Sequence, residues 1–189
     1  MENIGEIKIG QQIWMVENLN ISNFKNGELI KEAQSDSDWL DSLNKKEPAW
    51  CYYKQDEKHG KKYGKLYNEF VLADERGLLD GWCLPNNEDW NELCHSIGGK
   101  SSAGLHLKSE KGWKKNGNGI NDIGFNAKPG GGRFDRGTFM SEKARAHFWS
   151  CSKDIDDRFS FVFVMEGLDS LKLIQGSSRG YSIRLLKRS

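Results

Sequence analysis

The sequence predicts a single α+β domain over residues 1–189, with helices in its first half and an antiparallel sheet in its second. Three observations support this prediction. The length suits one domain with a full core. Apolar residues recur with helical spacing through 87–97. After residue 145, short apolar runs alternate with turn residues, which is typical of strands. Elements in this order favour an α+β fold.

Composition narrows the class of protein. Seven Trp and nine Phe predict an aromatic core and exclude a disordered chain. The formal net charge of +1 provides no field for nucleic acid, so we expect no nucleic-acid partner. No apolar run approaches the ~20 residues of a membrane span. The first ten residues lack the basic and apolar regions of a signal peptide, so none is expected in this chain. The oligomeric state is left open.

The first half of the chain predicts short elements. Alternating apolar residues on both sides of Gly10 predict a β-hairpin over about 7–15. Ser and Asp residues ahead of Trp39 predict a helix over 36–44. The segment 49–53 is typical of a strand, and we expect a charged loop at 56–64. Residues 65–77 fit a helix or a strand, and both alternatives stay open.

The clearest element is a helix over 87–97. Asn86 and Asn87 can cap it, and acidic residues fill its first turn. Trp90 begins an apolar stripe that continues through Leu93, Cys94 and Ile97, so we assign Trp90 and Cys94 to the core. Gly98 and Gly99 end the helix, since glycine accepts the left-handed conformation at no steric cost.

The second half predicts glycine-rich turns followed by strands. Between 100 and 144 we expect little regular structure beyond a short strand at 124–128, with "GGGR" (130–133) as a turn or bulge. Strands are predicted at four segments: 147–152, 158–167, 170–176 and 180–186. In 159–165 the phenylalanines and Met165 alternate with Val162 and Val164. Both faces are apolar, which predicts an inner strand covered on both sides.

The sequence shows no recognisable catalytic or metal-binding motif. The cysteines at 51, 83, 94 and 151 form no C-x-x-C pair, which argues against a thiolate zinc site. His147 and Cys151 lie four residues apart on a predicted strand, about 13 Å, too far to exchange a proton. We therefore expect no catalytic residues and no enzymatic activity.

A calcium site is the one cofactor hypothesis that the residues suggest. The loop "NGNGIND" (116–122) offers side-chain oxygens from Asn116, Asn118 and Asp122, the ligand type that calcium prefers. Ile120 interrupts the pattern and the loop holds a single carboxylate, so we favour a plain glycine–asparagine turn and no bound cofactor.

Six fragments carry a resemblance to a known family. In chain order they are "IGQQIWMVENLN", "YGKLYN", "GWCLPNNEDWNEL", "GFNAKPGGGR", "FWSCS" and "YSIRLL". In this order the chain resembles the Fibrobacter succinogenes major paralogous domain, common in Bacteroidetes-type surface proteins. The resemblance implies a C-type-lectin-like, formylglycine-generating-enzyme-like fold, with two helices packed on a twisted antiparallel sheet. It also implies an extracellular or cell-surface location.

The resemblance assigns roles to further residues. The family usually has His at the position of Cys83 and often Ser at that of Cys151, so a disulfide between the two cysteines and two buried thiols both stay open. Arg133 and Arg184 lie in stretches that resemble family motifs. Each is expected to pin loops to the sheet through backbone carbonyls.

A recognition function follows from the same analogy. Ligands of lectin-like folds meet loops near the C-terminal half, here around 134–142, 152–158 and 175–180. The expected ligand-binding residues are Arg136, Lys153, Arg158, Gln175 and Arg179, with Trp113 as an aromatic plate. We expect a non-catalytic module for a protein or glycan. The alternatives are a metal-dependent enzyme of the related fold and a structural component of a cell-surface assembly.

Overall fold

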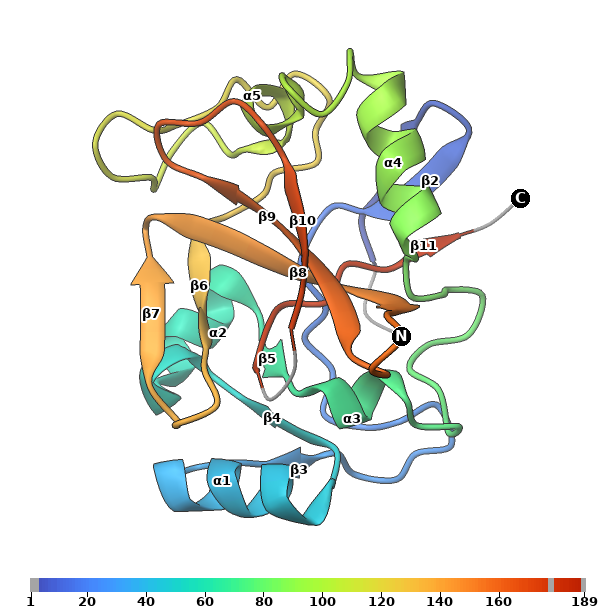
Figure 1. Ribbon diagram of the computed structural model, residues 1–189, viewed down its shortest axis with the longest axis vertical. Coiled ribbons are helices and arrows are strands. Elements are labelled where there is room, and N and C mark those ends of the chain that lie inside the picture. The colour runs from blue at the N-terminus through green and yellow to red at the C-terminus, as the bar shows by residue number, and fades with distance from the viewer. Residues whose placement is uncertain (1–3, 177–178, 188–189) are drawn as a thin grey trace.

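The computed structural model describes residues 4–176 and 179–187. It is a mixed α/β structure, as the sequence predicts, with three sheets and five α-helices in the described ranges (Figure 1). None of those helices is long and apolar enough to cross a membrane. The elements are β1 Glu6–Ile9, β2 Gln12–Met15, β3 Lys31–Glu32, α1 Asp36–Lys45, β4 Ala49–Cys51, a 3₁₀ turn Tyr53–Gln55, α2 Glu57–Tyr63, β5 Leu66–Tyr67, α3 Glu69–Leu72, α4 Asn87–Ser96, α5 Ala103–Leu107, β6 Gly130–Arg133, β7 Phe139–Glu142, β8 Arg145–Lys153, β9 Phe159–Met165, β10 Lys172–Gln175 and β11 Leu186–Lys187.

The largest sheet has the strand order β10-β9-β8-β6-β7 (Figure 1). Its strands pair antiparallel except β6 and β8, which run parallel at Gly131 and Ala146. The prediction of a purely antiparallel sheet is therefore wrong at this junction. "GGGR", expected as a turn or bulge, is the buried strand β6 itself. Glycine is required there because a Cβ on Gly132 would lie 2.7 Å from the Tyr181 ring.

Strand β9 confirms the predicted inner strand. It lies between β10 and β8, and its first six residues are buried. Phe161 and Phe163 pack into one apolar cluster, while Val162 and Val164 pack into another on the opposite face. The alternation of large and β-branched side chains thus separates two cores on the two sides of one strand.

Helix α4 confirms the helix predicted at 87–97. The Asn86 side chain accepts a hydrogen bond from the Asp89 backbone N–H, and the Asp89 carboxylate accepts one from the Asn86 backbone N–H, which forms a capping box. Trp90 is fully buried against Trp14, with ring centroids 4.8 Å apart, and packs with Val162 and Val164 in the same cluster. The helix therefore covers the valine face of β9.

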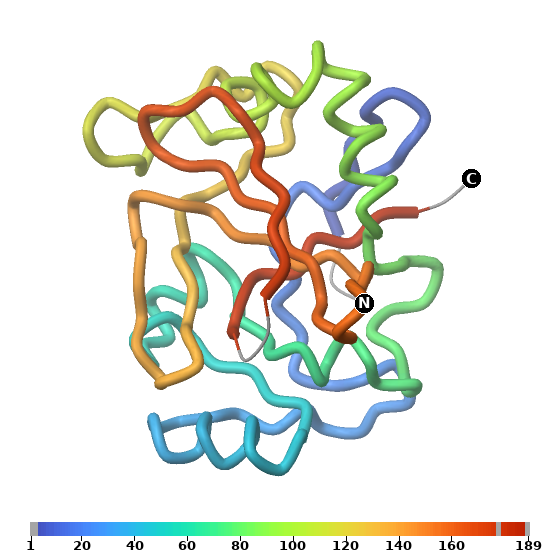
Figure 2. Tube along the Cα trace, viewed as in Figure 1, coloured from blue at the N-terminus to red at the C-terminus, as the bar shows by residue number. Residues whose placement is uncertain are grey.

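The first hairpin is confirmed as β1 and β2, and its partner comes from the far end of the chain. β11 pairs antiparallel with β2 through Leu186 and Trp14 (Figure 2). The strand expected at 180–186 is mostly a set of single bridges, with regular pairing only at 186–187. Those bridges tie Tyr181 to Tyr67 and Ser182 to Phe148.

Other predictions in the first half need correction. The charged loop expected at 56–64 is helix α2, capped by Asp56, whose carboxylate accepts from the Lys58 backbone. Gly60 lies inside this helix because the Tyr52 ring packs on it, 2.1 Å from where a Cβ would lie. The open choice at 65–77 is resolved as β5 followed by α3. The predicted helix at 36–44 is confirmed as α1.

Two corrections concern the segment 100–144. A short helix, α5, occupies 103–107 where no regular structure was expected. The strand expected at 124–128 is reduced to one bridge between Lys108 and Ala127. The described residues thus hold five α-helices rather than the two that the family resemblance implies, although only α1 and α4 reach ten residues.

All four cysteines are thiols in the structure, so the disulfide alternative is not formed. The Cys83 thiol lies 3.2 Å from the Leu186 carbonyl oxygen, and the Cys151 thiol lies 3.6 Å from that of Leu84. Cys51 and Cys94 are buried, and burial raises the pKa of each to about 11. Such thiols stay protonated at neutral pH and pack as small apolar side chains.

Candidate functional site

Two buried rings stack on one face of β8. His147 stacks on Tyr181 with ring centroids 4.6 Å apart and an interplanar angle of 14°. Burial lowers the pKa of His147 to about 3, although its hydrogen bond to the Gly131 carbonyl opposes the shift. His147 is therefore neutral at physiological pH. Because a carbonyl can only accept, Nδ1 donates to Gly131 O at 3.2 Å.

Two arginines lie beside this pair. The guanidinium of Arg145 lies 5.1 Å from the centroid of the Phe163 ring, and that of Arg179 lies 4.6 Å from the Phe134 ring. The charges of both add to the lowering of the His147 pKa, after burial. Among the described residues, neither guanidinium forms an ion pair with a carboxylate. Both side chains are half-buried, and Arg179 Nε is buried without a hydrogen-bond partner among the described residues.

Strand register extends this surface. Arg145 lies opposite Met165, Lys172 opposite Phe163, and Ile174 opposite Phe161, and directly opposed residues share one face of a sheet. Ile174 is 45% exposed, and Lys172 is exposed without a carboxylate partner in the described chain. We call the set Arg145, Met165, Lys172, Ile174 and Arg179 the basic face. It combines three cations that have no carboxylate partner among the described residues with the exposed Ile174 and the partly buried Met165.

The structure divides the predicted ligand-binding residues. Arg179 belongs to the basic face, and Gln175 follows Ile174 at the end of β10. Arg136 is exposed in the turn between β6 and β7. Lys153 and Arg158 flank the turn between β8 and β9. Lys153 pairs with Asp157 at 2.8 Å and Arg158 with Asp154 at 2.7 Å, so their charges are neutralised within that turn.

Lys153 is also distant from the basic face. Arg145 begins β8 and Lys153 ends it, eight residues later, which separates them by roughly 26 Å. The predicted loops therefore do not form one surface: 175–180 joins the basic face, and 152–158 lies at the other end of the strand.

Trp113 is a correction. It was expected as an exposed aromatic plate, but it is only 6% exposed and belongs to the core cluster beneath α4. Its indole Nε1 donates to Ser109 Oγ at 3.1 Å. The residues on both sides of Trp113 in the sequence are polar or glycine, so the sequence does not reveal that its ring is buried.

The suggested calcium ligands have separate partners. Asn118 Oδ1 accepts from the Trp113 backbone N at 3.1 Å, and Asp122 bonds His106 Nδ1 at 2.9 Å. Asn116 is exposed with a positive φ of 56°, as in a glycine–asparagine turn. Within 4–176 and 179–187, no three His, Cys, Asp or Glu side chains are grouped so that they could hold a metal ion.

Arg133 and Arg184 both make backbone contacts. Arg184 is fully buried and its NH1 donates to the carbonyls of Met15, Val16 and Phe125 at 2.6–3.0 Å. Arg133 is equally buried and donates to Gly137 O and Ser35 O, which joins the turn after β6 to the start of α1.

Sequence reasoning missed Arg145, Lys172 and Ile174. A signal was present, since Arg145 and His147 are two residues apart on β8, and Lys172 and Ile174 are two residues apart on β10, so each pair shares a face of its strand. The residues of β8 and β10 come to one face through the pairing of both strands with β9, and the sequence does not determine that register.

Comparison with protein-family models matches residues 7–187 to the family described as the Fibrobacter succinogenes major domain. Neither the curated proteins nor the solved structures searched gave a match to the chain. The match covers nearly the whole chain.

Proposed function

The chain belongs to the Fibrobacter succinogenes major domain family, and from this premise we propose that it is a non-catalytic recognition module that binds an acidic protein partner through the basic face. The observation that carries the proposal is the set of three cations, Arg145, Lys172 and Arg179, which lack a carboxylate partner among the described residues. Strand register brings two of them to one face beside Met165 and Ile174, and such a grouping of charge favours an external anionic partner.

Of the two ligand classes expected from the sequence, the basic face favours a protein. Its apolar members, Ile174 and Met165, are flexible aliphatic side chains rather than flat aromatic plates. Such side chains suit aliphatic groups on a partner surface, and methionine adapts to irregular contacts. A partner with carboxylates spaced around an apolar side chain would satisfy both kinds of group.

The scaffold supports recognition by fixing the cations. Arg145 and Arg179 lie over phenylalanine rings, so part of the entropy of ordering them is lost before binding. We include in the proposal the C-type-lectin-like scaffold that the family resemblance implies. Its support is helix α4, whose Trp90 packs with Val162 and Val164 of the central sheet.

Binding to immobilised peptides tests the function. One peptide set alternates Glu with Leu, and a matched set carries Gln in place of every Glu. We expect the acidic set to bind and the Gln set to bind at least about tenfold more weakly. Affinity should fall as salt is raised, because the contacts are largely between exposed charges.

Two charge-removing variants locate the surface. R145Q/R179Q should lose the acidic peptides, while K153Q/R158Q removes the same charge at the other end of β8 and should retain them. Unfolding curves of both variants establish that they are folded. The proposal would be contradicted if only K153Q/R158Q lost binding. It would also be contradicted if the parent chain bound no acidic peptide but bound clearly to a glycan array.

A further inference from the structure

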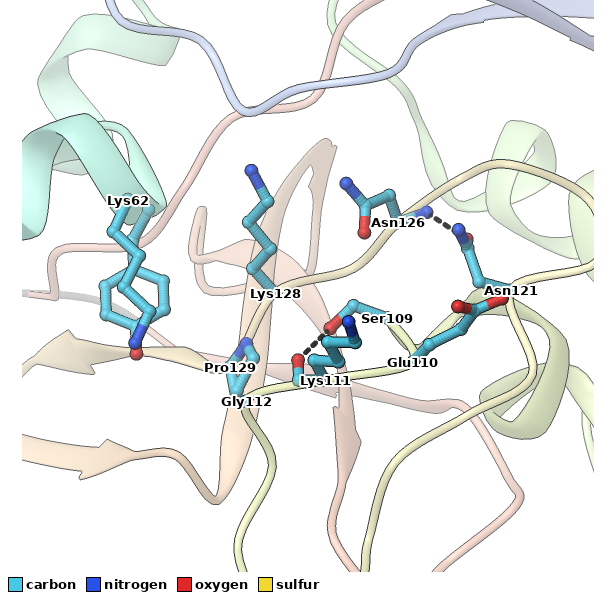
Figure 3. A pocket seen from close by; sticks show the side chains of 10 residues that line it. Lys62, Ser109, Glu110, Lys111, Gly112, Asn121, Asn126, Lys128 and Pro129 are labelled. Carbon is cyan, nitrogen blue, oxygen red and sulfur yellow. Dashed lines mark hydrogen bonds between the residues drawn. The ribbon is translucent and has the colours of Figure 1, made fainter.

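A second site lies between α2 and the segment 109–129, where an open pocket of about 630 Å³ is present (Figure 3). This volume suits a small ligand such as a short saccharide. The pocket shares no residue with the basic face. Its lining residues are Lys62, Tyr63, Ser109, Glu110, Lys111, Gly112, Asn121, Asn126, Lys128 and Pro129.

Positive charge dominates the pocket. Three lysines line it against one carboxylate, that of Glu110. Lys128 is already paired with Glu17 at 2.6 Å. Lys62 and Lys111 form no ion pair among the described residues, and both are exposed. An anionic group on a ligand would therefore meet two ammonium groups that the chain itself does not neutralise.

The charges are unevenly placed along the pocket. In Figure 3, Lys62 lies at one end of the pocket, Lys111 lies near its middle beside Ser109, and Asn121 lies toward the other end with Glu110. The first two positions favour anionic groups, while the far end offers a carboxylate and amides to neutral hydroxyl groups. A ligand that carries an anionic group and hydroxyls on one frame matches both ends.

The amide end is held in place by the backbone. Asn121 and Asn126 both have positive φ, 45° and 57°, a conformation that asparagine accepts more readily than most residues. Asn121 Oδ1 accepts from the Asn126 backbone N at 2.6 Å, which fixes the Asn121 side chain (Figure 3). This contact uses the Asn121 side-chain oxygen and leaves its amide NH₂ able to donate to a ligand oxygen.

Tyr63 orients a lysine of the same wall. Lys62 Nζ lies 4.7 Å from the centre of the Tyr63 ring, a distance at which the ring attracts the ammonium group. The Tyr63 hydroxyl is buried and makes no hydrogen bond to any described residue, so the ring rather than the hydroxyl contributes to the pocket.

We propose that this pocket binds an anionic saccharide, with carboxylates or sulfates at Lys62 and Lys111 and hydroxyls at Asn121 and Glu110. Acid sugars combine localised negative charges with several hydroxyls. An apolar ligand or a neutral sugar would leave the charge of the two ammonium groups unused. This site is independent of the acidic protein partner proposed for the basic face.

Titration calorimetry on the full chain tests the site with three probes of equal length: a trisaccharide of galacturonic acid, a sulfated trisaccharide of galactose, and neutral galactotriose. Inorganic sulfate is the fourth probe. We expect one or both acidic trisaccharides to bind at least about tenfold more tightly than galactotriose and than sulfate alone. The two acidic probes distinguish carboxylate from sulfate recognition.

Charge-removing variants assign the binding to this pocket. K62Q/K111Q should weaken the acidic trisaccharides by about tenfold or more. K58Q/K100Q removes two exposed cations elsewhere and should leave binding unchanged, as should R145Q/R179Q. The proposal is overturned if neither acidic trisaccharide binds, if galactotriose or sulfate binds as tightly, or if K62Q/K111Q binds like the parent chain.

Discussion

Arg184 and Asn18 form two hydrogen bonds with each other although they lie far apart in the chain. Arg184 donates to Asn18 Oδ1 from Nε at 3.2 Å and from NH2 at 2.7 Å, and both residues are buried. The same guanidinium donates to three backbone carbonyls. Burial lowers the pKa of Arg184 to about 9, which leaves it charged at neutral pH. One side chain therefore satisfies acceptors from the first hairpin and from the Phe125 segment.

Replacing Arg184 should destabilise the chain strongly. In R184M the aliphatic stem is kept, but the carbonyls of Met15, Val16 and Phe125 lose their donor in the core. We expect the free energy of unfolding in urea to fall by roughly 3 kcal/mol. R184K should fall almost as far, because an ammonium cannot span all these acceptors. K100M, at an exposed lysine, is the control and should change little. Equal stability of R184M and K100M would show that the guanidinium is dispensable.

His147 should make stability depend on pH. Its folded pKa of about 3 lies below the unfolded value of 6.5, so the unfolded chain binds the proton more readily between them. Stability from this group is therefore full above pH 6.5 and is lost as pH falls toward 3. The loss approaches 5 kcal/mol as an upper bound, about 1.4 kcal/mol for each pKa unit. Urea unfolding at a series of pH values measures it.

The variant H147F isolates that contribution. Phenylalanine keeps the ring against Tyr181 but cannot bind a proton. The stability of the parent chain relative to H147F should therefore fall as pH is lowered from 6.5, because only the parent chain carries the His147 titration. The other histidines are common to both proteins and cancel in the difference. A difference that stays constant with pH would mean that His147 titrates in the native state as it does when unfolded.

Gly60 should tolerate no side chain. In G60A the new Cβ would lie 2.1 Å from Tyr52 Cε1, so the ring or helix α2 must move. Alanine favours helices by about 1 kcal/mol over glycine, and a clash of this kind costs more. We expect a lower melting temperature despite the gain in helix propensity. G5A, where the nearest atom is at 3.4 Å, is the matched control. The double variant Y52A/G60A should recover the helix gain, and a stabilised G60A would contradict the packing.

Thiol reactivity should report the folded core. Cys51 and Cys94 are 1% exposed, and burial raises the pKa of each. Both should react slowly with a disulfide reagent in the native state, since the thiolate is the reacting form. All four cysteines should react once the chain is unfolded in guanidinium. Native reaction at the unfolded rate would place these thiols outside the core.

Sequence patterns predicted the elements whose stabilising contacts are local. The capping box at Asn86 and the alternation in β9 need only near neighbours, and both were predicted correctly. Helix α2 was missed because its Gly60 and four charged residues argue against a helix, whereas the Tyr52 ring that packs on it lies outside the segment. Strand β6 was missed because three successive glycines carry no side-chain pattern. Glycine is needed there because the rings of Tyr63 and Tyr181 pack directly on Gly130 and Gly132.

In the candidate site, too, only residues whose position depends on local sequence could be predicted. Arg179 could be named from its loop, but its neighbours Arg145 and Lys172 join it only through the register of β8, β9 and β10. Trp113 was misplaced because a tryptophan between glycines and asparagines gives no sign of the depth of its ring. Long-range pairing, rather than residue type, decides which polar side chains share a surface.

The pairing of β2 with β11 has a consequence for how the protein is made. Trp14 leaves the ribosome long before its partner Leu186, and until then the four-residue strands of the first hairpin lack their third strand. A two-stranded hairpin of that size is marginal alone in water. The nascent chain therefore completes its first sheet only after Leu186 has been synthesised, and a product that stops before Ile183 would expose Trp14 to chaperones and proteases.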